Sequence, residues 1–269
     1  MAHVLAVANQ KGGVAKTTTV ASLGVALHDL GKRVLLIDLD PQACLTFSLG
    51  VDPDSLPVSV HDVLLGELPI GQAIVDTADG PSLLPATIDL ATTESMLLTR
   101  TGREYGLRMA IADLSSTEDG HFDHILIDCP PSLGVLTVNA LTAASDLLIP
   151  LQCETLSHRG VGQLLNTVKD IQRMTNPGLQ VLGVLPTLFD ARTLHSRDVL
   201  DDVTDRYGLP VLDPPIGRSV RFAEAPAAGR SVLATAGRTK GAHAYREHAE
   251  FLVARAARAV GAAGTVGPG

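Results

Sequence analysis

The sequence predicts an α/β protein built on a single doubly wound, mostly parallel sheet with helices on both faces. Short runs rich in Val, Ile and Leu alternate with longer segments of helical spacing along the whole chain. The runs lack polar alternation, which is typical of strands covered on both faces. We therefore expect one domain over residues 1–260, followed by a flexible, glycine-rich tail over residues 261–269.

The positions of the individual strands and helices are predicted from this alternation and from the polar, glycine and proline residues that interrupt it. The expected strands are short apolar runs that end in polar, glycine or proline residues, and they cover residues 4–8, 34–38, 124–128, 147–150 and 181–185. Pro41 follows the second run and directs the chain into a loop. Helical spacing predicts helices over residues 17–30, 134–144, 160–173 and 242–260.

Composition excludes several classes of protein. With 45% hydrophobic and 19% charged residues among 269, the chain can bury a core and is too apolar to be disordered. Aromatic residues make up only 3%, with no Trp, which argues against a stacking platform for single strands. No apolar run approaches the roughly 20 residues that span a membrane. Without an export signal or an even set of cysteines, the chain is expected to be cytoplasmic.

The net charge of −8 hides an uneven distribution. Residues 214–269 carry a net charge of +5, and the first 213 residues carry −13. At physiological salt, charges more than about 8 Å apart are largely screened, so a local basic face can attract phosphates while the far side stays acidic. The overall charge therefore does not exclude binding to nucleic acid.

A glycine-containing loop after the first strand predicts a phosphate site. Gly12 and Gly13 allow backbone N–H groups to approach phosphate oxygens, and the helix that follows adds its positive dipole end. Lys16 is placed to reach the β- and γ-phosphates, and the Thr17 hydroxyl to bind Mg²⁺. The loop departs from the strict Walker pattern, because Gln10 and Ala15 occupy its two glycine positions.

Acidic residues follow two other predicted strands. Asp38 and Asp40 come at the end of the second strand, and Asp128 ends the strand at residues 124–128. Open α/β sheets bind ligands at the carboxyl ends of their strands, and P-loop enzymes hold an aspartate behind Mg²⁺. The three acids are therefore expected close to the phosphate loop.

These motifs resemble the ParA/MinD ATPases, which carry a deviant Walker A loop with an additional signature lysine, here Lys11. The Soj-type ParA branch, which partitions chromosomes and plasmids, is the most similar. The resemblance extends over about residues 3–250, through segments 11–18, 38–42, 85–90, 127–131, 190–193 and 220–226. It implies a deviant P-loop fold and ATP and Mg²⁺ as cofactors. It also implies a nucleotide-binding loop formed by Lys11, Gly12, Gly13, Val14, Ala15, Lys16, Thr17 and Thr18.

The resemblance also implies a mechanism. Two protomers would enclose two ATP molecules, and Lys11 of each would reach the partner's nucleotide, adding a second cation beside Lys16 as an arginine finger does. Asp40 would orient or deprotonate the attacking water, and Asp128 would act on the metal through its water shell. Hydrolysis would be slow, stimulated by a ParB-type partner, and used to segregate DNA.

In the Soj-type branch, arginines that match Arg192 and Arg221 bind DNA phosphates without reading sequence. Dimerisation would double the number of these cations, which links DNA affinity to the bound nucleotide. Arg218, Arg238 and Lys240 are weaker candidates of the same kind. We therefore expect non-specific binding to double-stranded DNA and association with the nucleoid.

Other readings of the sequence remain open. A MinD-like membrane switch needs a bulky amphipathic C-terminal helix, whereas Tyr245, Leu252 and Ala256 are more typical of a face packed on the sheet. Shared metal or cluster chemistry is disfavoured, because Cys44, Cys129 and Cys153 are widely spaced. A related ATPase that positions another cargo, or a nucleotide-gated adaptor that does not hydrolyse ATP, is also compatible with the motifs.

Two further expectations concern specificity. The resemblance implies adenine rather than guanine, and the loop over residues 214–219 is our choice for the base contact. Arg159 stands where the Soj-type branch more often has an acidic residue, which makes the identity of the partner less certain than the nucleotide chemistry.

Overall fold

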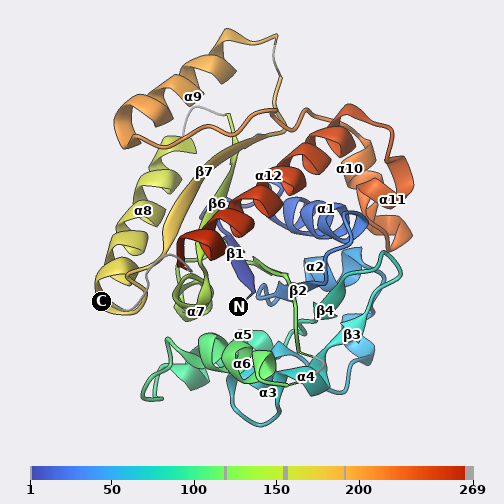
Figure 1. Ribbon diagram of the computed structural model, residues 1–269, viewed down its shortest axis with the longest axis vertical. Helices are drawn as coiled ribbons and strands as arrows, with labels where there is room; N and C mark the ends of the chain where they lie inside the picture. The colour runs from blue at the N-terminus through green and yellow to red at the C-terminus, as the bar shows by residue number, and fades with distance from the viewer. Residues whose placement is uncertain (1, 118–119, 154–156, 191, 264–269) are drawn as a thin grey trace.

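The computed structural model describes residues 2–117, 120–153, 157–190 and 192–263, and it contains one seven-stranded sheet (Figure 1). The strand order is β3-β4-β2-β5-β1-β6-β7. The strands are β1 (His3–Val7), β2 (Val34–Asp38), β3 (Val75–Asp76), β4 (Ser82–Leu84), β5 (His124–Asp128), β6 (Asp146–Gln152) and β7 (Gln180–Thr187). All neighbouring pairs are parallel except β3 and β4. The predicted fold class is confirmed.

The central strands are buried on both faces, as their uninterrupted apolar sequences predict. Every residue of β1, β2 and β5 is buried. Alternate residues of β1 serve different cores: Val4 and Ala6 pack on one side of the sheet, and Leu5 and Val7 on the other. This two-sided burial is the reason that the strands show no polar alternation.

Two strands at one edge of the sheet are absent from the sequence prediction. β4 extends the parallel sheet beside β2, and β3 pairs antiparallel with β4 at the outer edge. They contain only three and two residues. Segments this short have no measurable hydrophobic period, so they are set by their tertiary neighbours.

Helices cover both faces. One face is covered by α1 (Lys16–Asp29), α2 (Cys44–Ser48), α11 (Val232–Ala236) and α12 (Lys240–Ala263). The other is covered by α3 (Val60–Leu64), α4 (Ile70–Ala73), α5 (Leu90–Leu97), α6 (Gly106–Ser115), α7 (Val135–Ala143), α8 (Ser157–Met174) and α9 (Leu194–Tyr207). The short α10 (Arg221–Glu224) and the 3₁₀ turns Pro53–Ser55 and Pro226–Ala228 complete the elements.

The last helix packs mainly on another helix rather than directly on the sheet. α12 lies against α1 (Figure 1), and Tyr245 and Leu252 are buried in the core that these two helices share. The expected apolar face is therefore present, with α1 between much of it and the strands. α12 continues to Ala263, beyond the expected end at residue 260. The rest of the predicted tail, residues 264–269, lies outside the described residues.

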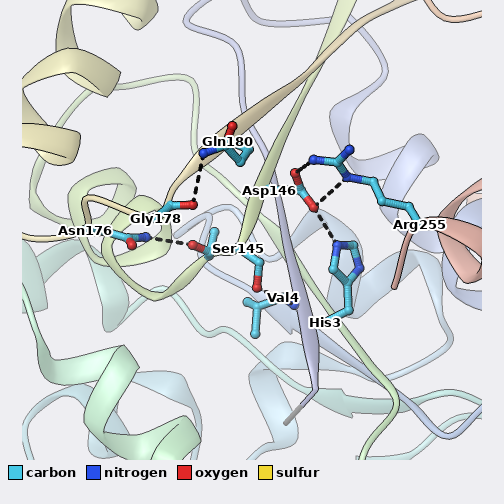
Figure 2. Close-up of polar contacts among 9 residues, drawn as sticks. His3, Val4, Ser145, Asp146, Asn176, Gly178, Gln180 and Arg255 are labelled. Atoms are coloured by element: carbon cyan, nitrogen blue, oxygen red, sulfur yellow. Dashed lines mark hydrogen bonds and ion pairs between the residues drawn. The ribbon is translucent and has the colours of Figure 1, made fainter. Parts of the chain in front are cut away.

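A polar cluster fixes the far part of α12 to the amino ends of the strands. Asp146, the first residue of β6, receives a hydrogen bond from Arg255 Nε at 3.0 Å and lies 2.7 Å from His3 Nε2 of β1 (Figure 2). Its second oxygen accepts from Arg255 Nη2 at 2.5 Å. Both partners lower the pKa of Asp146, against the opposing effect of its burial. This cluster lies at the amino ends of the strands, and the predicted phosphate loop lies at their carboxyl ends.

Candidate functional site

The predicted phosphate loop joins β1 to α1 and ends in left-handed backbone. Gly13 has φ of 73° and Ala15 has φ of 63°. The residue that replaces the usual Walker glycine therefore adopts the conformation that glycine favours, at a cost of about 1 kcal/mol. Helix α1 begins at the next residue, and no side chain caps it. Its first N–H groups and its dipole are thus available to an anion.

Side chains beyond the predicted set hold the loop in place. Asn9 Nδ2 donates to the carbonyl of Pro150 at 2.7 Å, and Asn9 Oδ1 accepts from the N–H of Lys11 at 3.0 Å. Thr187, at the end of β7, donates to the carbonyl of Val14 at 3.0 Å. The loop is thereby tied to the ends of β6 and β7. Sequence reasoning missed both residues; the position of Asn9 directly after an apolar strand was the available signal for the first.

Lys16 lies within the curve of the loop. It is buried, with 7% of its surface exposed, and its Nζ lies 3.4 Å from the carbonyl oxygen of Lys11. A buried ammonium needs compensating partners, and besides the nearby carboxyl group of Asp128 it has this one long contact to a carbonyl. A phosphate oxygen held by the same loop would supply the rest, which fits the predicted role of Lys16.

The predicted acids meet at the neighbouring strand ends. Asp38 and Asp128 are paired residues in the register of β2 and β5, and Asp128 also pairs with Val7, the last residue of β1. Thr46 donates its N–H and its hydroxyl to Asp38 Oδ2 at 2.9 and 2.7 Å. Burial nevertheless raises the pKa of Asp38 to about 6. The role of Thr46, on α2, was not predicted.

Asp128 is the least satisfied carboxyl group of the site. It is 1% exposed, and neither of its oxygens accepts a well-formed hydrogen bond. Burial raises its pKa well above the usual range, and the nearby charge of Asp38 raises it further. Thr17 and Lys16 lie close enough to lower it in part. A buried carboxylate beside a threonine hydroxyl is a donor set that suits Mg²⁺ and its water shell, so these residues fit the predicted metal.

Asp40 lies just beyond the two buried acids and is half-buried. Its N–H donates to Asp38 Oδ1 at 3.1 Å, and its own Oδ1 accepts from the N–H of Gln42 at 3.0 Å. Its charge raises the pKa of both Asp38 and Asp128, so it lies within electrostatic reach of them. A carboxylate that borders solvent at this edge can accept a proton from water, which is the chemistry expected of it.

Comparison with known proteins agrees with this geometry. A family profile described as an AAA domain matches residues 2–181. The chain is 43% identical over 254 residues to the chromosome partitioning protein ParA of Caulobacter vibrioides, with 94% of each chain covered. It is 40% identical over 255 residues to the sporulation initiation inhibitor protein Soj of Bacillus subtilis, covering 94% of this chain and 99% of Soj. The chain belongs to the ParA/MinD family of ATPases.

Solved structures extend the comparison. A crystal structure named cobyrinic acid a,c-diamide synthase from Mycobacterium smegmatis, with a bound ATP analogue and magnesium, is 62% identical, with a TM-score of 0.84 and coverage of 94% and 95%. The cell division ATPase MinD of Pyrococcus furiosus is 29% identical, with a TM-score of 0.75 and coverage of 93% and 98%. This ParA/MinD-family chain is thus a Mg²⁺-dependent P-loop ATP hydrolase, with ATP and Mg²⁺ as its cofactors.

The two arginines predicted to bind DNA come from segments that the fold brings together. Phe189 forms a parallel bridge with Gly217, so the turn before Arg192 and the segment leading to Arg221 run side by side. Arg218 lies close enough to lower the pKa of Asp190. Arg192 and Arg218 are thus close to one end of β7, although 26 residues separate them in sequence, and Arg221 lies three residues after Arg218, on α10.

Acidic neighbours engage both predicted arginines. Arg192, whose side chain is 90% exposed, forms two hydrogen bonds to Asp190, at 2.9 and 2.7 Å. That pairing lowers the pKa of Asp190. Arg221 Nη1 lies 2.8 Å from Glu224 Oε2. Exposed pairs of this kind contribute at most about 1 kcal/mol, so DNA phosphates can compete for both guanidinium groups.

The loop over residues 214–219 lies at the carboxyl end of β7, where Ile216 donates its N–H to Pro186 at 2.8 Å. This position is compatible with a contact to the base of a nucleotide. The side chain of Arg159 is outside the described residues, so its predicted effect is not addressed by the structure.

The cysteines, the acidic and histidine groups and the helices bear on the remaining readings of the sequence. Cys129 and Cys153 are buried and Cys44 is exposed, and none of them forms a disulfide. Within the described ranges, no group of three or more His, Cys, Asp or Glu residues is arranged to hold a metal ion. Among the helices of those same ranges, none is long and apolar enough to cross a membrane.

Proposed function

We propose that this chain is a partitioning ATPase that dimerises on ATP, binds DNA without sequence preference and hydrolyses ATP slowly to segregate a chromosome or plasmid. The observation that carries the proposal is the signature lysine Lys11 in a loop otherwise built for ATP, in a chain about 40% identical to ParA and Soj over nearly its full length. In such a system the nucleotide state controls the assembly, and the assembly controls affinity for DNA.

In the proposed reaction, the loop residues 11–18 bind the phosphates and Thr17 supplies its hydroxyl to the metal. Mg²⁺ neutralises charge on the β- and γ-phosphates when it is bound. Asp128 orients the metal's water shell, and Asp40 holds the attacking water and takes its proton. Lys11 of the partner protomer stabilises the charge that develops on the transferred phosphoryl group, which makes dimerisation a condition for turnover.

The DNA surface of the proposed dimer consists of Arg192 and Arg221 from both protomers, with Arg218 beside them. The closeness of Arg192 and Arg218 at one end of β7, with Arg221 three residues further along the chain, supports this assignment. Six phosphate contacts in the dimer would give a slope of about −5 in a plot of log affinity against log salt concentration. Binding that ignores both salt and ATP would contradict the assignment.

The proposal includes a ParB-type partner that stimulates hydrolysis with a short basic segment. The net charge of −13 on residues 1–213 supports attraction to such a segment. The protein would act in the cytoplasm on the nucleoid. The test is the rate of ATP hydrolysis with DNA alone, with the partner alone and with both; we expect the largest rate with both, and equal rates in all conditions would overturn the proposal.

A second candidate function comes from the name of the 62% identical structure, cobyrinic acid a,c-diamide synthase. Amidation of a carboxylic acid needs ATP to activate the acid and a source of nitrogen. A thiolate that releases ammonia from an amide is one such source, but burial raises the pKa of Cys129 and Cys153, and burial together with Asp40 raises that of Cys44. Hydrolysis stimulated by cobyrinic acid and not by DNA would favour this function.

The positioning of a cargo other than DNA is the remaining alternative. MinD, at 29% identity, supports a shared ATPase cycle. A MinD-like membrane switch would bring the protein down with liposomes when ATP is present. We expect it to remain in the supernatant, because α12 uses Tyr245 and Leu252 to pack against α1.

A further inference from the structure

A buried hydrogen bond links the nucleotide helix to the last helix. Thr19 of α1 lies two residues after Thr17, and its hydroxyl is 3.0 Å from the hydroxyl of Tyr245 on α12. Both residues are fully buried, and Tyr245 is the largest fully buried side chain of the described residues. A buried hydroxyl pair is costly to separate, so a displacement of the first turn of α1 is carried to Tyr245.

An aromatic contact continues the connection to the helix that carries Arg221. The ring of Phe222 meets the ring of Tyr245 edge to face, with centroids 6.1 Å apart and planes at 88°. Gly241, near the start of α12, makes room for it: a Cβ at that position would lie 2.5 Å from Phe222 Cζ. The ring is therefore held between Tyr245 and the backbone of α12.

Within the four-residue helix α10, Phe222 is the main side chain that packs inward, and the buried Ala225 follows the helix directly. None of its residues is fully buried, and Phe222 is the one that is half-buried while the other three are exposed. A small cavity of about 20 Å³ separates this region from the first turn of α1, and its lining includes Thr17, Thr18 and Phe222. The contact between Phe222 and Tyr245 is thus one of the contacts that position the helix of Arg221.

We propose that Thr19, Tyr245 and Phe222 form a relay that sets the position of Arg221 according to whether α1 holds ATP. The proposal rests on the function proposed above, in which ATP strengthens DNA binding through Arg221. A phosphate bound at the first turn of α1 pulls on that turn; Tyr245 follows Thr19, and the Phe222 ring moves α10 with it. Tyr245 is a positioning residue, and it touches neither nucleotide nor DNA.

The experiment compares affinity for a short fluorescent DNA duplex in the presence of a non-hydrolysable ATP analogue and in the presence of ADP. The measured quantity is the ratio of the dissociation constant for DNA with ADP to that with the ATP analogue, so a larger ratio means a stronger effect of ATP. In Tyr245→Phe, we expect this ratio to fall at least about fivefold, because one buried hydrogen bond of the relay is lost. Affinity for the ATP analogue itself should stay within about twofold of the parent protein.

Further variants separate the relay from a general loss of structure. Tyr105→Phe removes a tyrosine hydroxyl at the start of α6 and should leave the ratio unchanged. Thr19→Val should lower the ratio as Tyr245→Phe does, and the double variant should lower it no further, since both remove one interaction. Gly241→Ala displaces Phe222 without touching the hydroxyl pair and should also lower the ratio, although alanine favours the helix.

The outcomes distinguish the relay from the function on which it rests. If the parent protein itself binds DNA equally with ADP and the ATP analogue, the proposed function fails. If the parent shows the ATP-dependent gain and Tyr245→Phe and Gly241→Ala both retain it, the relay is wrong. Hydrogen exchange gives a second readout: ATP should change the protection of residues 219–226 in the parent protein and not in Tyr245→Phe.

Discussion

At the scale of single residues, the site is defined by buried charges that lack full compensation. Lys16 is buried with one long contact to a carbonyl, and Asp128 is buried without a well-formed hydrogen bond. Both groups are expensive to keep in this state. In the proposed site, a bound nucleotide and its metal would complete these interactions.

The first prediction concerns Lys16. In Lys16→Ala, affinity for a fluorescent ATP analogue should fall at least about 100-fold, because a buried charge-assisted contact to the phosphates is lost. Lys32→Ala is the matched control, since Lys32 lies at the other end of α1 and should bind the analogue like the parent protein. Equal binding by the two variants would contradict the assignment.

The second prediction concerns the acid that holds Arg192. In Asp190→Asn, affinity for duplex DNA in the presence of ATP should rise about two- to fivefold, because the guanidinium is released and a charge that repels phosphate is removed. Asp205→Asn makes the same change of net charge at an exposed position on α9 and should have a smaller effect. Equal gains in the two variants would show that only net charge matters.

At the scale of elements, α12 connects both ends of the sheet. Its first half meets α1 through Tyr245, and its second half reaches the amino ends of β1 and β6 through Arg255. The cluster around Asp146 therefore anchors the far half of the helix, in addition to the packing on α1 (Figure 2). The predicted effects of changing it are on stability, because the cluster is remote from the nucleotide loop.

The third prediction tests that cluster. Arg255→Met should lower the free energy of unfolding by about 1–3 kcal/mol, since Asp146 loses two charged hydrogen bonds and keeps only His3. Arg258→Met, an exposed position on the same helix, should cost less than about 0.5 kcal/mol. Denaturant unfolding measures both, and similar losses would mean that the cluster is not a fixed point of the fold.

The fourth prediction concerns the stability of the same region at low pH. Burial lowers the pKa of His124 to about 4, with a further contribution from His3, whose ring lies 5.4 Å away. The folded state therefore disfavours the charged ring. The stability that comes from keeping His124 neutral is fully present above pH 6.5, and it is lost as the pH falls towards 4. One proton accounts for at most about 1.4 kcal/mol per pH unit.

Unfolding measured from pH 7 to 4.5 tests this effect. His124→Phe keeps a ring of similar size and removes the proton, so its free energy of unfolding should decline less steeply than that of the parent protein. Parallel curves for the two proteins would show that His124 does not contribute to the acid sensitivity.

Elements with a strong local signal could be predicted, and those set by tertiary contacts could not. Strands such as β2 and β5 are continuous apolar runs, so their positions agree with the sequence prediction to the residue. The strands β3 and β4, by contrast, are too short to show a period. The fold class therefore follows from the sequence, while one edge of the sheet does not.

The same division holds for the site. Loop residues and acids were predicted because a motif and a strand end mark them. Thr46 and Thr187 were missed, because no motif or strand pattern links either to its partner: Thr46, on α2, holds Asp38, and Thr187 holds the carbonyl of Val14, which is 173 residues away. Such roles become visible only when the chain is folded.

At the scale of the whole molecule, the proposed function requires a second copy. In the proposed dimer, one protomer would supply Lys16, Thr17 and the acids, and its partner would supply Lys11. Assembly and turnover would then be controlled by the same nucleotide, and the basic surface around β7 would be doubled in the same step. A monomer alone would bind ATP and turn it over poorly.

The most direct measurement is the mass of the hydrolysis-deficient protein by sedimentation. Asp40→Ala should bind ATP and Mg²⁺, hydrolyse it far more slowly than the parent, and sediment as a dimer with ATP and a monomer with ADP. Adding Lys11→Ala should return the ATP-bound protein to a monomer. If Asp40→Ala binds ATP and stays monomeric at high concentration, two protomers do not share the terminal phosphate and the partitioning mechanism is wrong.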